Sequence, residues 1–441
     1  MFRLDNAEQL TTEIVRELVV KFRGEELPRL RKLKDYYLNK TAILRRPCKD
    51  PSKPNNKVVH PYAQYITDTL TGYFVGEPIS YTSNTENTDD LAMIFEYNDE
   101  QDENMTLAKD CSIFGKAFEY VYLDKAGNVR FRAMDPRQII PIYGASIEDE
   151  LIAVVRFYPR SDTVFGVDDL IVEVYTDKDI TVYKTSNAVE TLHFVSKQPH
   201  AFNDVPFVEY KNNDDCYGDF EGVISLIDAY DALVSDDLND FEYFVDAYLA
   251  LYGYNAEAED IQNMKDNRVL LLDQDGKAEW LVKNGDSSGV ETTKQRLERD
   301  IHKFSKTPDS NDTNFGANVS GVAMRYKLLG TENLGSIKER KFKKGLQRRL
   351  ELIAHILNVL SRPSFDWLGI EIIFTRNLPV NEDDVSTMIK NLNGIVSKQT
   401  LVGQLPFVDD PVKEMEQLNN EMRSQIFFAN PTLEPNQEED N

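Results

Sequence analysis

The stretch Gly285-Asp-Ser-Ser-Gly289 comes nearest to a catalytic motif in this chain. It fits Gly-x-Ser-x-Gly, the pattern of a nucleophile elbow, in which Ser287 would attack an acyl group, and it lies between a predicted strand and a predicted helix. Such a hydrolase also needs an aspartate and a histidine in a parallel α/β frame. Only His302 and His355 follow, both on predicted helices outside such a frame. The simpler interpretation is a turn whose small residues start the next helix.

The other polar residues indicate little further chemistry. The histidines show no metal-ligand spacing, and the sequence has no paired-cysteine motif and no phosphate-binding Gly-x-x-x-x-Gly-Lys loop. Asp214, Asp215, Asp219 and Glu221 gather before a long predicted helix. They either hold a hard cation or form a solvated loop that favours the positive end of that helix. We expect no catalytic residue, no metal and no cofactor.

Composition indicates a folded chain with an excess of acid. Its 441 residues are 41% hydrophobic, and 75 acidic against 50 basic residues give a formal charge of −25. This charge argues against a tight nucleic-acid clamp, because affinity for DNA comes largely from Lys and Arg that displace counterions. It leaves open a conduit to which DNA must not adhere. The three cysteines are far apart, and neither a membrane span nor a secretory signal is evident, so we expect a soluble protein made in cytoplasm.

The first half of the chain predicts an α+β domain. Helices are expected over residues 6–20, 25–37, 61–73, 89–97 and 104–114. From Lys116 to Tyr210 the pattern changes to short strands, with Asp124–Asn128 as a hairpin turn. We expect these strands to form one meandering sheet, at residues 117–123, 129–134, 139–143, 151–158, 170–175, 180–184, 191–195 and 207–211.

The second half predicts long helices separated by small modules. A helix over residues 223–251 has an acidic face, which is either solvated or a pore wall that repels DNA. A small module with a short helix at 256–265 and strands at 268–272 and 277–283 follows, and a helix over 290–306 returns. A polar loop at 307–321, which is a linker in the simplest interpretation, leads into a helix over 322–360. A strand is expected at 369–374 and helices within 381–423.

The predicted helix over residues 322–360 has one apolar stripe and a cationic remainder. Phe342, Leu346 and Leu350 recur at helical spacing, whereas Lys and Arg residues crowd the stretch from Lys338 to Arg349. These cations either contact phosphates or face solvent and a neighbouring subunit, where carboxylates are plentiful.

Several collinear stretches resemble the portal (head-to-tail connector) proteins of long-tailed bacteriophages. They span roughly residues 30 to 420 and are specific as a set rather than singly. The matching stretches are Pro51-Ser-Lys-Pro-Asn-Asn-Lys57, residues 66–81, Leu226-Ile-Asp-Ala-Tyr230, Ser235-Asp-Asp-Leu-Asn-Asp240, Ser320-Gly-Val-Ala323 and Leu405-Pro-Phe-Val-Asp-Asp-Pro411.

The resemblance implies a non-enzymatic ring, usually of twelve copies, at one capsid vertex of the virion. Double-stranded DNA would be packaged and ejected through it. The implied partners are the terminase large subunit, a head-completion or adaptor protein, and the major capsid and scaffolding proteins, with no membrane. In this arrangement the parts would be a wing (residues 1–222), a stem helix (223–251), a clip (252–289), a second stem helix (290–306), a tunnel loop (307–321), a helix and strand completing the wing (322–380), a short helical crown (381–428) and a disordered acidic tail (429–441).

The resemblance also implies three functional surfaces. The loop would face DNA, but it has no Lys or Arg between Thr307 and Met324, so a passive collar or one-way gate is favoured over a grip. Cyclic closure requires two different patches on each subunit, which acidic and basic surfaces could supply. The candidates are Asn311, Asn314, Phe315 and Asn318 for the loop, Lys294, Arg299, Lys303 and Lys306 for the channel side of the stem, and Asp236, Asp240, Lys338, Lys341, Lys344 and Arg348 for the subunit interface.

Two other classes of function remain open at this point. One is a serine hydrolase that uses Ser287, which a fluorophosphonate probe would label. The other is a monomeric cytoplasmic scaffold that binds partners through its acidic helix, which a measurement of native mass would separate from a ring.

Overall fold

The computed structural model describes residues 2–48, 50–51, 53–83, 89–161, 168–245, 248–252, 262, 277–281, 287–309, 326–376, 382–405, 408 and 411–429. The chain forms two compact units. The first comprises Met1–Ser310 and Leu328–Asn377, and the second comprises Asn311–Lys327 and Leu378–Asn441. The mixture of helices and sheets confirms the α+β class.

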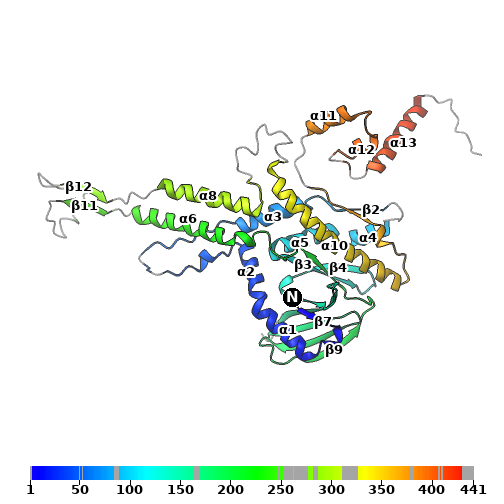
Figure 1. Ribbon diagram of the computed structural model, residues 1–441, viewed down its shortest axis with the longest axis horizontal. Helices are drawn as coiled ribbons and strands as arrows, with labels where there is room; N and C mark the ends of the chain where they lie inside the picture. The colour runs from blue at the N-terminus through cyan, green and yellow to red at the C-terminus, as the bar shows by residue number, and fades with distance from the viewer. Residues whose placement is uncertain are drawn as a thin grey trace, which may run out of the picture. The chain divides into compact units, whose positions relative to one another are not determined.

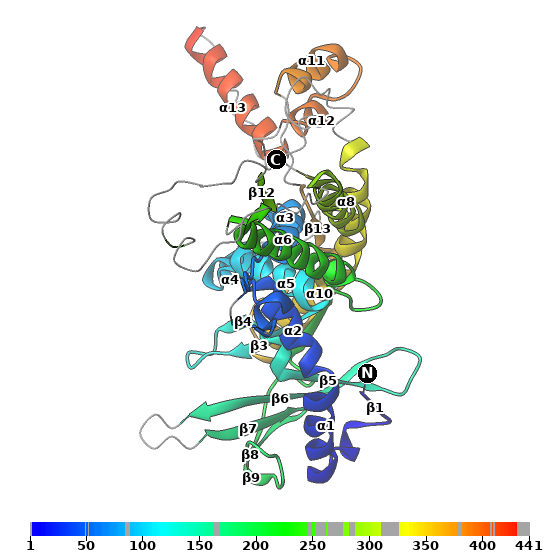
Figure 2. The same ribbon diagram turned by 90° about the vertical axis from the view of Figure 1, so that its left-hand side faces the viewer.

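A six-stranded sheet forms one part of the first unit (Figures 1 and 2). Its first strand pairs in parallel with the second, and the other neighbours are antiparallel. Helix α1 (Thr12–Glu25) packs against it, with the Phe22 and Phe157 rings 5.7 Å apart. In sheet order the strands are β1 (Phe2–Leu4), β5 (Ile139–Gly144), β6 (Leu151–Ser161), β7 (Asp168–Tyr175), β8 (Asp179–Ser186) and β9 (His193–Pro199).

A separate three-stranded sheet holds the predicted hairpin. Strands β3 (Lys116–Leu123) and β4 (Val129–Met134) are joined by the expected turn, in which the Asp124 carboxylate accepts the backbone N–H groups of Ala126 and Asn128 at 2.8 and 2.9 Å. Strand β10 (Phe207–Lys211) pairs with the other edge of β3. The single meandering sheet that we expected is therefore two sheets, because β10 returns to β3 instead of continuing from β9.

Helix α10 (Leu329–Val359) lies against the three-stranded sheet. Its predicted apolar stripe is confirmed, since Phe342, Leu346 and Leu350 are all buried in one core. The helix begins at Leu329, later than the predicted start at Val322, and residues 322–325 lie outside the described part. Gly345 permits the close approach to the sheet, because a Cβ there would lie 2.4 Å from the Tyr210 ring.

The remaining elements of the first unit follow the predicted order with shifted bounds. The extended Ser80–Thr82 segment, β2, pairs with β13 (Glu371–Ile373), which confirms the late strand. The helices that complete this unit around the two sheets are α2 (Leu27–Tyr37), α3 (Tyr62–Val75), α4 (Asp89–Tyr97) and α5 (Glu100–Phe114).

The second unit is helical where the structure describes it. Ser397 caps α12 by accepting the Thr400 N–H at 3.2 Å. The predicted tail beyond residue 429 lies outside the described residues. Among the helices described in both units, none is long and apolar enough to span a bilayer. The helices of the second unit are α11 (Glu382–Leu392), α12 (Lys398–Val402) and α13 (Pro411–Ala429).

Candidate functional site

Two antiparallel helices, which we call the stem, project from the body of the first unit. Helix α6 (Ile224–Val245) and helix α8 (Ser287–Ser305) lie side by side and lead to the paired strands β11 (Tyr248–Tyr252) and β12 (Lys277–Leu281) (Figure 1). The predicted helix through Leu251 thus ends earlier, because the apolar run after it forms a strand that pairs with β12. The predicted elements at 256–265 and 268–272 lie outside the described residues except Gln262.

The two stem helices differ in charge. Helix α6 carries Asp and Glu residues but no Lys or Arg, whereas α8 carries both signs. One ion pair links the two helices, with Lys294 Nζ 2.5 Å from Asp237 Oδ2. Of the cations that we assigned to the channel side, Lys294 is therefore committed to α6, while Arg299, Lys303 and Lys306 are exposed. The Lys303 ammonium lies 5.4 Å from the centre of the Phe304 ring.

The surface of the stem also exposes large apolar side chains. Phe241 on α6 is 68% exposed and Phe304 on α8 is 59% exposed, and Leu238, three residues before Phe241, is 37% exposed. Within this subunit none of these three side chains is fully covered.

The segment from Thr41 to His60, which precedes α3, is held along α6 by hydrogen bonds and an ion pair. Buried Asp231 accepts hydrogen bonds from the backbone N–H of His60 at 2.9 Å and from the Thr41 hydroxyl at 2.7 Å. Farther along α6, Asn56 donates to Glu242 at 2.8 Å. Arg46 forms an ion pair with Asp236 at 2.6 Å, so Asp236, which we assigned to the subunit interface, has a partner within its own chain.

The turn after α8 is fixed by three hydrogen bonds, one to its own helix and two from neighbouring helices. Lys306 adopts a left-handed conformation (φ 57°), and the Thr307 N–H bonds to the His302 carbonyl at 3.1 Å, which closes the helix. The Thr331 hydroxyl of α10 donates to the Lys306 carbonyl at 2.7 Å. The Tyr65 hydroxyl of α3 donates to the Pro308 carbonyl at 2.8 Å. This turn brings Asp309 near Glu298 and His302, a grouping that we did not predict.

The DNA-facing loop proposed from the sequence lies outside the described residues. Asn311, Asn314, Phe315 and Asn318 all fall in the interval 310–325. Their roles remain predictions.

The cationic stretch of α10 is largely paired within the chain. Lys338 is buried and bonds to buried Asp219, so a subunit interface cannot reach it and that prediction is corrected. Lys341 pairs with Asp214, and Arg348 pairs with Asp204 at 2.5 Å and Glu351 at 2.7 Å. Lys344 is exposed. The sequence could not show these pairings, because each carboxylate except Glu351 belongs to a distant loop.

The acidic cluster before α6 is likewise divided among cations. Asp219 faces Lys338, Asp214 faces Lys341, and Glu221 accepts from Arg29 at 2.7 Å. These residues therefore tie α2 and α10 to one loop. Asp214 is 82% exposed and Asp215 is exposed, as a solvated loop predicts, whereas Asp219 and Glu221 are largely buried in their ion pairs.

Arg349 forms a buried ionic cluster that the sequence did not reveal. Its guanidinium donates to Glu119 at 2.7 and 2.8 Å and to Glu100 at 3.0 Å, and all three side chains are buried. The Tyr210 hydroxyl adds a bond to Glu119 at 2.9 Å, and Tyr81 donates to Glu100 at 2.5 Å. These bonds join helices α5 and α10 to strands β2, β3 and β10.

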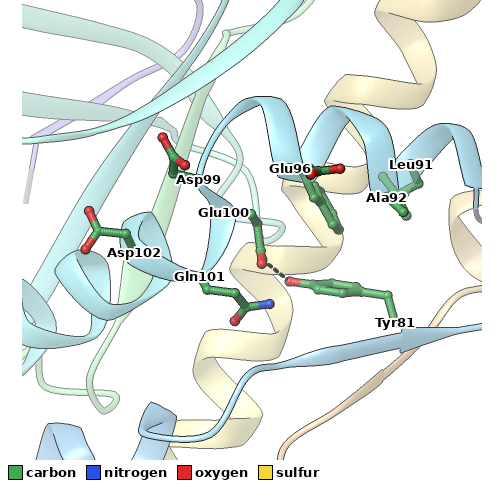
Figure 3. A pocket seen from close by; sticks show the side chains of 9 residues that line it. Tyr81, Leu91, Ala92, Glu96, Asp99, Glu100, Gln101 and Asp102 are labelled. Atoms are coloured by element: carbon green, nitrogen blue, oxygen red, sulfur yellow. Dashed lines mark hydrogen bonds between the residues drawn. The ribbon is translucent and has the colours of Figure 1, made fainter. Parts of the chain in front are cut away.

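A pocket of about 510 Å³ lies beside this cluster. Figure 3 shows the Tyr81 hydroxyl pointing at Glu100, with Leu91 and Glu96 on α4 nearby. Burial raises the pKa of Glu100, although Arg349 opposes the shift. Arg349 and the hydrogen bonds from Tyr81 and Asn104 thus offset only part of the cost of burying Glu100, and the arrangement indicates a structural role for the cluster.

Ser287 does not have the surroundings of a nucleophile elbow. It is the first residue of α8, and the strand before it belongs to a two-stranded antiparallel pair instead of a parallel sheet. His302 lies on the same helix, about 22 Å along its axis. A catalytic pair between Ser287 and His302 is incompatible with this separation.

Comparison with known proteins identifies the family. Residues 22–426 match the family described as "Phage portal protein, SPP1 Gp6-like". The portal protein of Bacillus phage SPP1 is 24% identical over 392 residues, covering 85% of this chain and 77% of that protein. The portal protein of Clostridium phage phiCD119 is 25% identical over 422 residues, covering 87% of this chain and 90% of that protein.

Two solved structures also align with the chain. They are chains from the neck of an empty GTA particle with C6 symmetry and of a native GTA particle with C12 symmetry. Each has a TM-score of 0.45 and 11% identity, and they cover 77% and 79% of this chain and 88% and 90% of their own. The match over residues 22–426 extends through both stem helices, the buried cluster and α10, and it shows that the chain belongs to the SPP1 Gp6-like family of phage portal proteins.

Proposed function

We propose that this protein is the subunit of a ring-shaped channel at one vertex of a phage capsid, through which double-stranded DNA is packaged and ejected. The observation that carries the proposal is the family match over residues 22–426. The stem is consistent with it, because a helix pair with uncovered apolar side chains suits side-by-side packing of identical copies.

The charge of the stem supports a conduit rather than a clamp. Helix α6 offers carboxylates alone, and a wall that repels phosphates keeps DNA free to move. Arg299, Lys303 and Lys306 are exposed cations of α8 and the adjoining turn, so we retain them as candidates for the channel side. For the subunit interface we retain Asp240, Lys341, Lys344 and Arg348, of which Lys341 and Arg348 would also keep their partners within the chain.

The finer assignments extend this proposal. Residues 252–289 would dock the terminase large subunit and later a head-completion or adaptor protein, and the wing would meet capsid and scaffolding proteins. Residues Asn311, Asn314 and Asn318 would border the DNA. In this role the protein is a virion component without catalysis of its own, made in the bacterial cytoplasm.

Native mass spectrometry and negative-stain imaging of the purified chain test the ring. We expect closed rings of about twelve copies, and Phe241→Glu should reduce their population because it places charge in an apolar contact. Phe194→Glu is the matched control, since Phe194 is 63% exposed on β9, away from the stem. A protein that stays monomeric at every ionic strength would overturn the proposal.

The loop is tested separately in assembled particles. Replacing Asn311, Asn314 and Asn318 by Trp should impair DNA packaging or retention while rings still form. Unchanged DNA content in such particles would refute a DNA-facing loop.

A further inference from the structure

We infer that Glu298, His302 and Asp309 bind one divalent transition-metal ion of the Zn²⁺ class at the end of α8. One ligand atom from each side chain lies within 4.8 Å of the other two, and all three residues are half-buried. Imidazole nitrogen and carboxylate oxygen bind Zn²⁺ at about 2.0–2.2 Å. Small side-chain rotations therefore suffice to close the three atoms around an ion.

Local structure places these ligands on one side of the stem. Glu298 and His302 are four residues apart on α8, so they share a helix face one turn apart. Asp309 follows the left-handed turn at Lys306, which reverses the chain toward the same face. The Tyr65 and Thr331 hydroxyls hold the carbonyls of Pro308 and Lys306, so the approach of Asp309 is fixed by contacts outside the cluster.

A second contact orients the imidazole for binding. His302 Nδ1 lies 3.2 Å from the Thr307 carbonyl oxygen, which can only accept, so Nδ1 carries the proton. Nε2 then keeps its lone pair for a metal. Metal-binding histidines usually have such a bond from the other nitrogen to a carbonyl or carboxylate. The Tyr62 and Tyr65 rings pack edge-on against the imidazole, at centroid distances of 6.1 and 5.6 Å, and restrict its rotation.

The ligand set also selects the kind of ion. Two carboxylates and a neutral imidazole supply two negative charges, which match a dication. A nitrogen ligand favours Zn²⁺ and its neighbours over Mg²⁺ and Ca²⁺, which prefer oxygen alone. A bound ion would join the last turns of α8 to the turn that leads into residue 310.

The test is metal titration of the purified full chain after chelator treatment, by calorimetry with Zn²⁺ and by visible absorption with Co²⁺. We expect one ion per chain, with affinity reduced at least tenfold by His302→Phe, which keeps a ring between Tyr62 and Tyr65. Glu298→Gln should weaken binding comparably and leaves the bond from His302 to Thr307 in place. His355→Phe, at an exposed position on α10, is the matched control and should bind as the parent does.

The inference is independent of ring formation, because it concerns ligands from one chain. It fails if the parent protein takes up no Zn²⁺, or if both His302→Phe and Glu298→Gln leave the affinity unchanged. Tighter binding of Ca²⁺ than of Zn²⁺ would also overturn it. Circular dichroism of each variant verifies that helical content is retained, and Glu298→Gln decides the matter if His302→Phe does not fold.

Discussion

The ion pairs inside the body and those along the stem differ in how much water reaches them. Arg349 and Glu119 are both fully buried, and two further polar groups, Tyr210 and Glu100, complete their hydrogen bonds. On the stem, Asp237 is 47% exposed while it pairs with Lys294. Loss of one partner from a buried ion pair strongly destabilises the fold, because the other charge stays buried without a partner, whereas an exposed ion pair contributes little to stability. The body thus stabilises the subunit by itself, while the stem leaves surfaces for other molecules to cover.

The largest expected effect is the loss of Arg349. Arg349→Ala strands Glu119 and Glu100 without a cation, and we expect it to lower the free energy of unfolding by about 3–5 kcal/mol. Urea unfolding followed by circular dichroism measures this. The adjacent Arg348→Ala should cost less than about 1 kcal/mol, since its partners Asp204 and Glu351 remain hydrated. Equal losses in the two variants would remove the distinction between buried and exposed pairs.

A second prediction concerns the close contact of α10 with β10. Gly345→Ala should lower the free energy of unfolding by about 1–3 kcal/mol, because the added methyl group meets the Tyr210 ring and the core must shift. Gly72→Ala in α3 is the control, since no atom lies within 4 Å of a Cβ there. It should stabilise by up to about 1 kcal/mol through helix propensity. Both values come from chemical denaturation, and a stable Gly345→Ala variant would contradict the close packing.

A third prediction concerns how the stability of the body depends on pH through Asp110 of α5. Burial raises the pKa of Asp110 to about 7, although Lys34 opposes the shift. The folded state keeps this proton between about pH 4 and pH 7, where the unfolded chain has lost it, so the stabilisation is present below pH 4 and disappears as pH rises through 7. Asp110→Asn should flatten the decline across this window by roughly 1–2 kcal/mol. An identical pH profile in the variant, measured by urea unfolding, would show that Asp110 titrates normally.

The smallest expected effect is on the stem pair. A double-mutant cycle of Lys294→Ala and Asp237→Ala should give a coupling of about 0.2–1 kcal/mol in subunit stability, decreasing with added salt. A coupling above about 2 kcal/mol, independent of salt, would mean that water does not reach this pair.

Assembly should depend on salt in the opposite sense. Twelve copies would carry a formal charge of about −300 (12 × −25), so added salt should favour rings by screening repulsion. Sedimentation at increasing ionic strength measures the ring fraction. Rings that dissociate steadily as salt rises would indicate that attraction between unlike charges dominates the interface.

Local patterns predicted local structure well. The hairpin turn at Asp124, helix α4 and the apolar stripe of α10 are confirmed because neighbours in sequence determine them. Strand β1 was missed, since its three residues form a strand only because they pair with β5, which is distant in sequence. The change from helix to strand after Val245 was missed for a similar reason, because an apolar run suits either structure until β12 supplies a partner.

The candidate site was less accessible to sequence reasoning. Lys338 and Arg349 looked solvated because charge on a helix usually is, and their burial depends on carboxylates from distant segments. The metal-ligand grouping of Glu298, His302 and Asp309 was missed, because Asp309 joins the other two only through the left-handed turn at Lys306. The family resemblance was confirmed because it rested on several collinear stretches rather than on one motif.

Helix α10 is held at two distant places, and this has a mechanical consequence. Near the start of α10, the Thr331 hydroxyl bonds to the turn that ends α8. About 27 Å farther along the axis of α10, Arg349 pairs with Glu119 in the core. A helix resists stretching, so a displacement of that turn must either tilt the whole helix about its anchor or break the Thr331 bond. Helix α10 thereby couples the two places, and a movement of the stem would be transmitted along it to the buried core around Arg349.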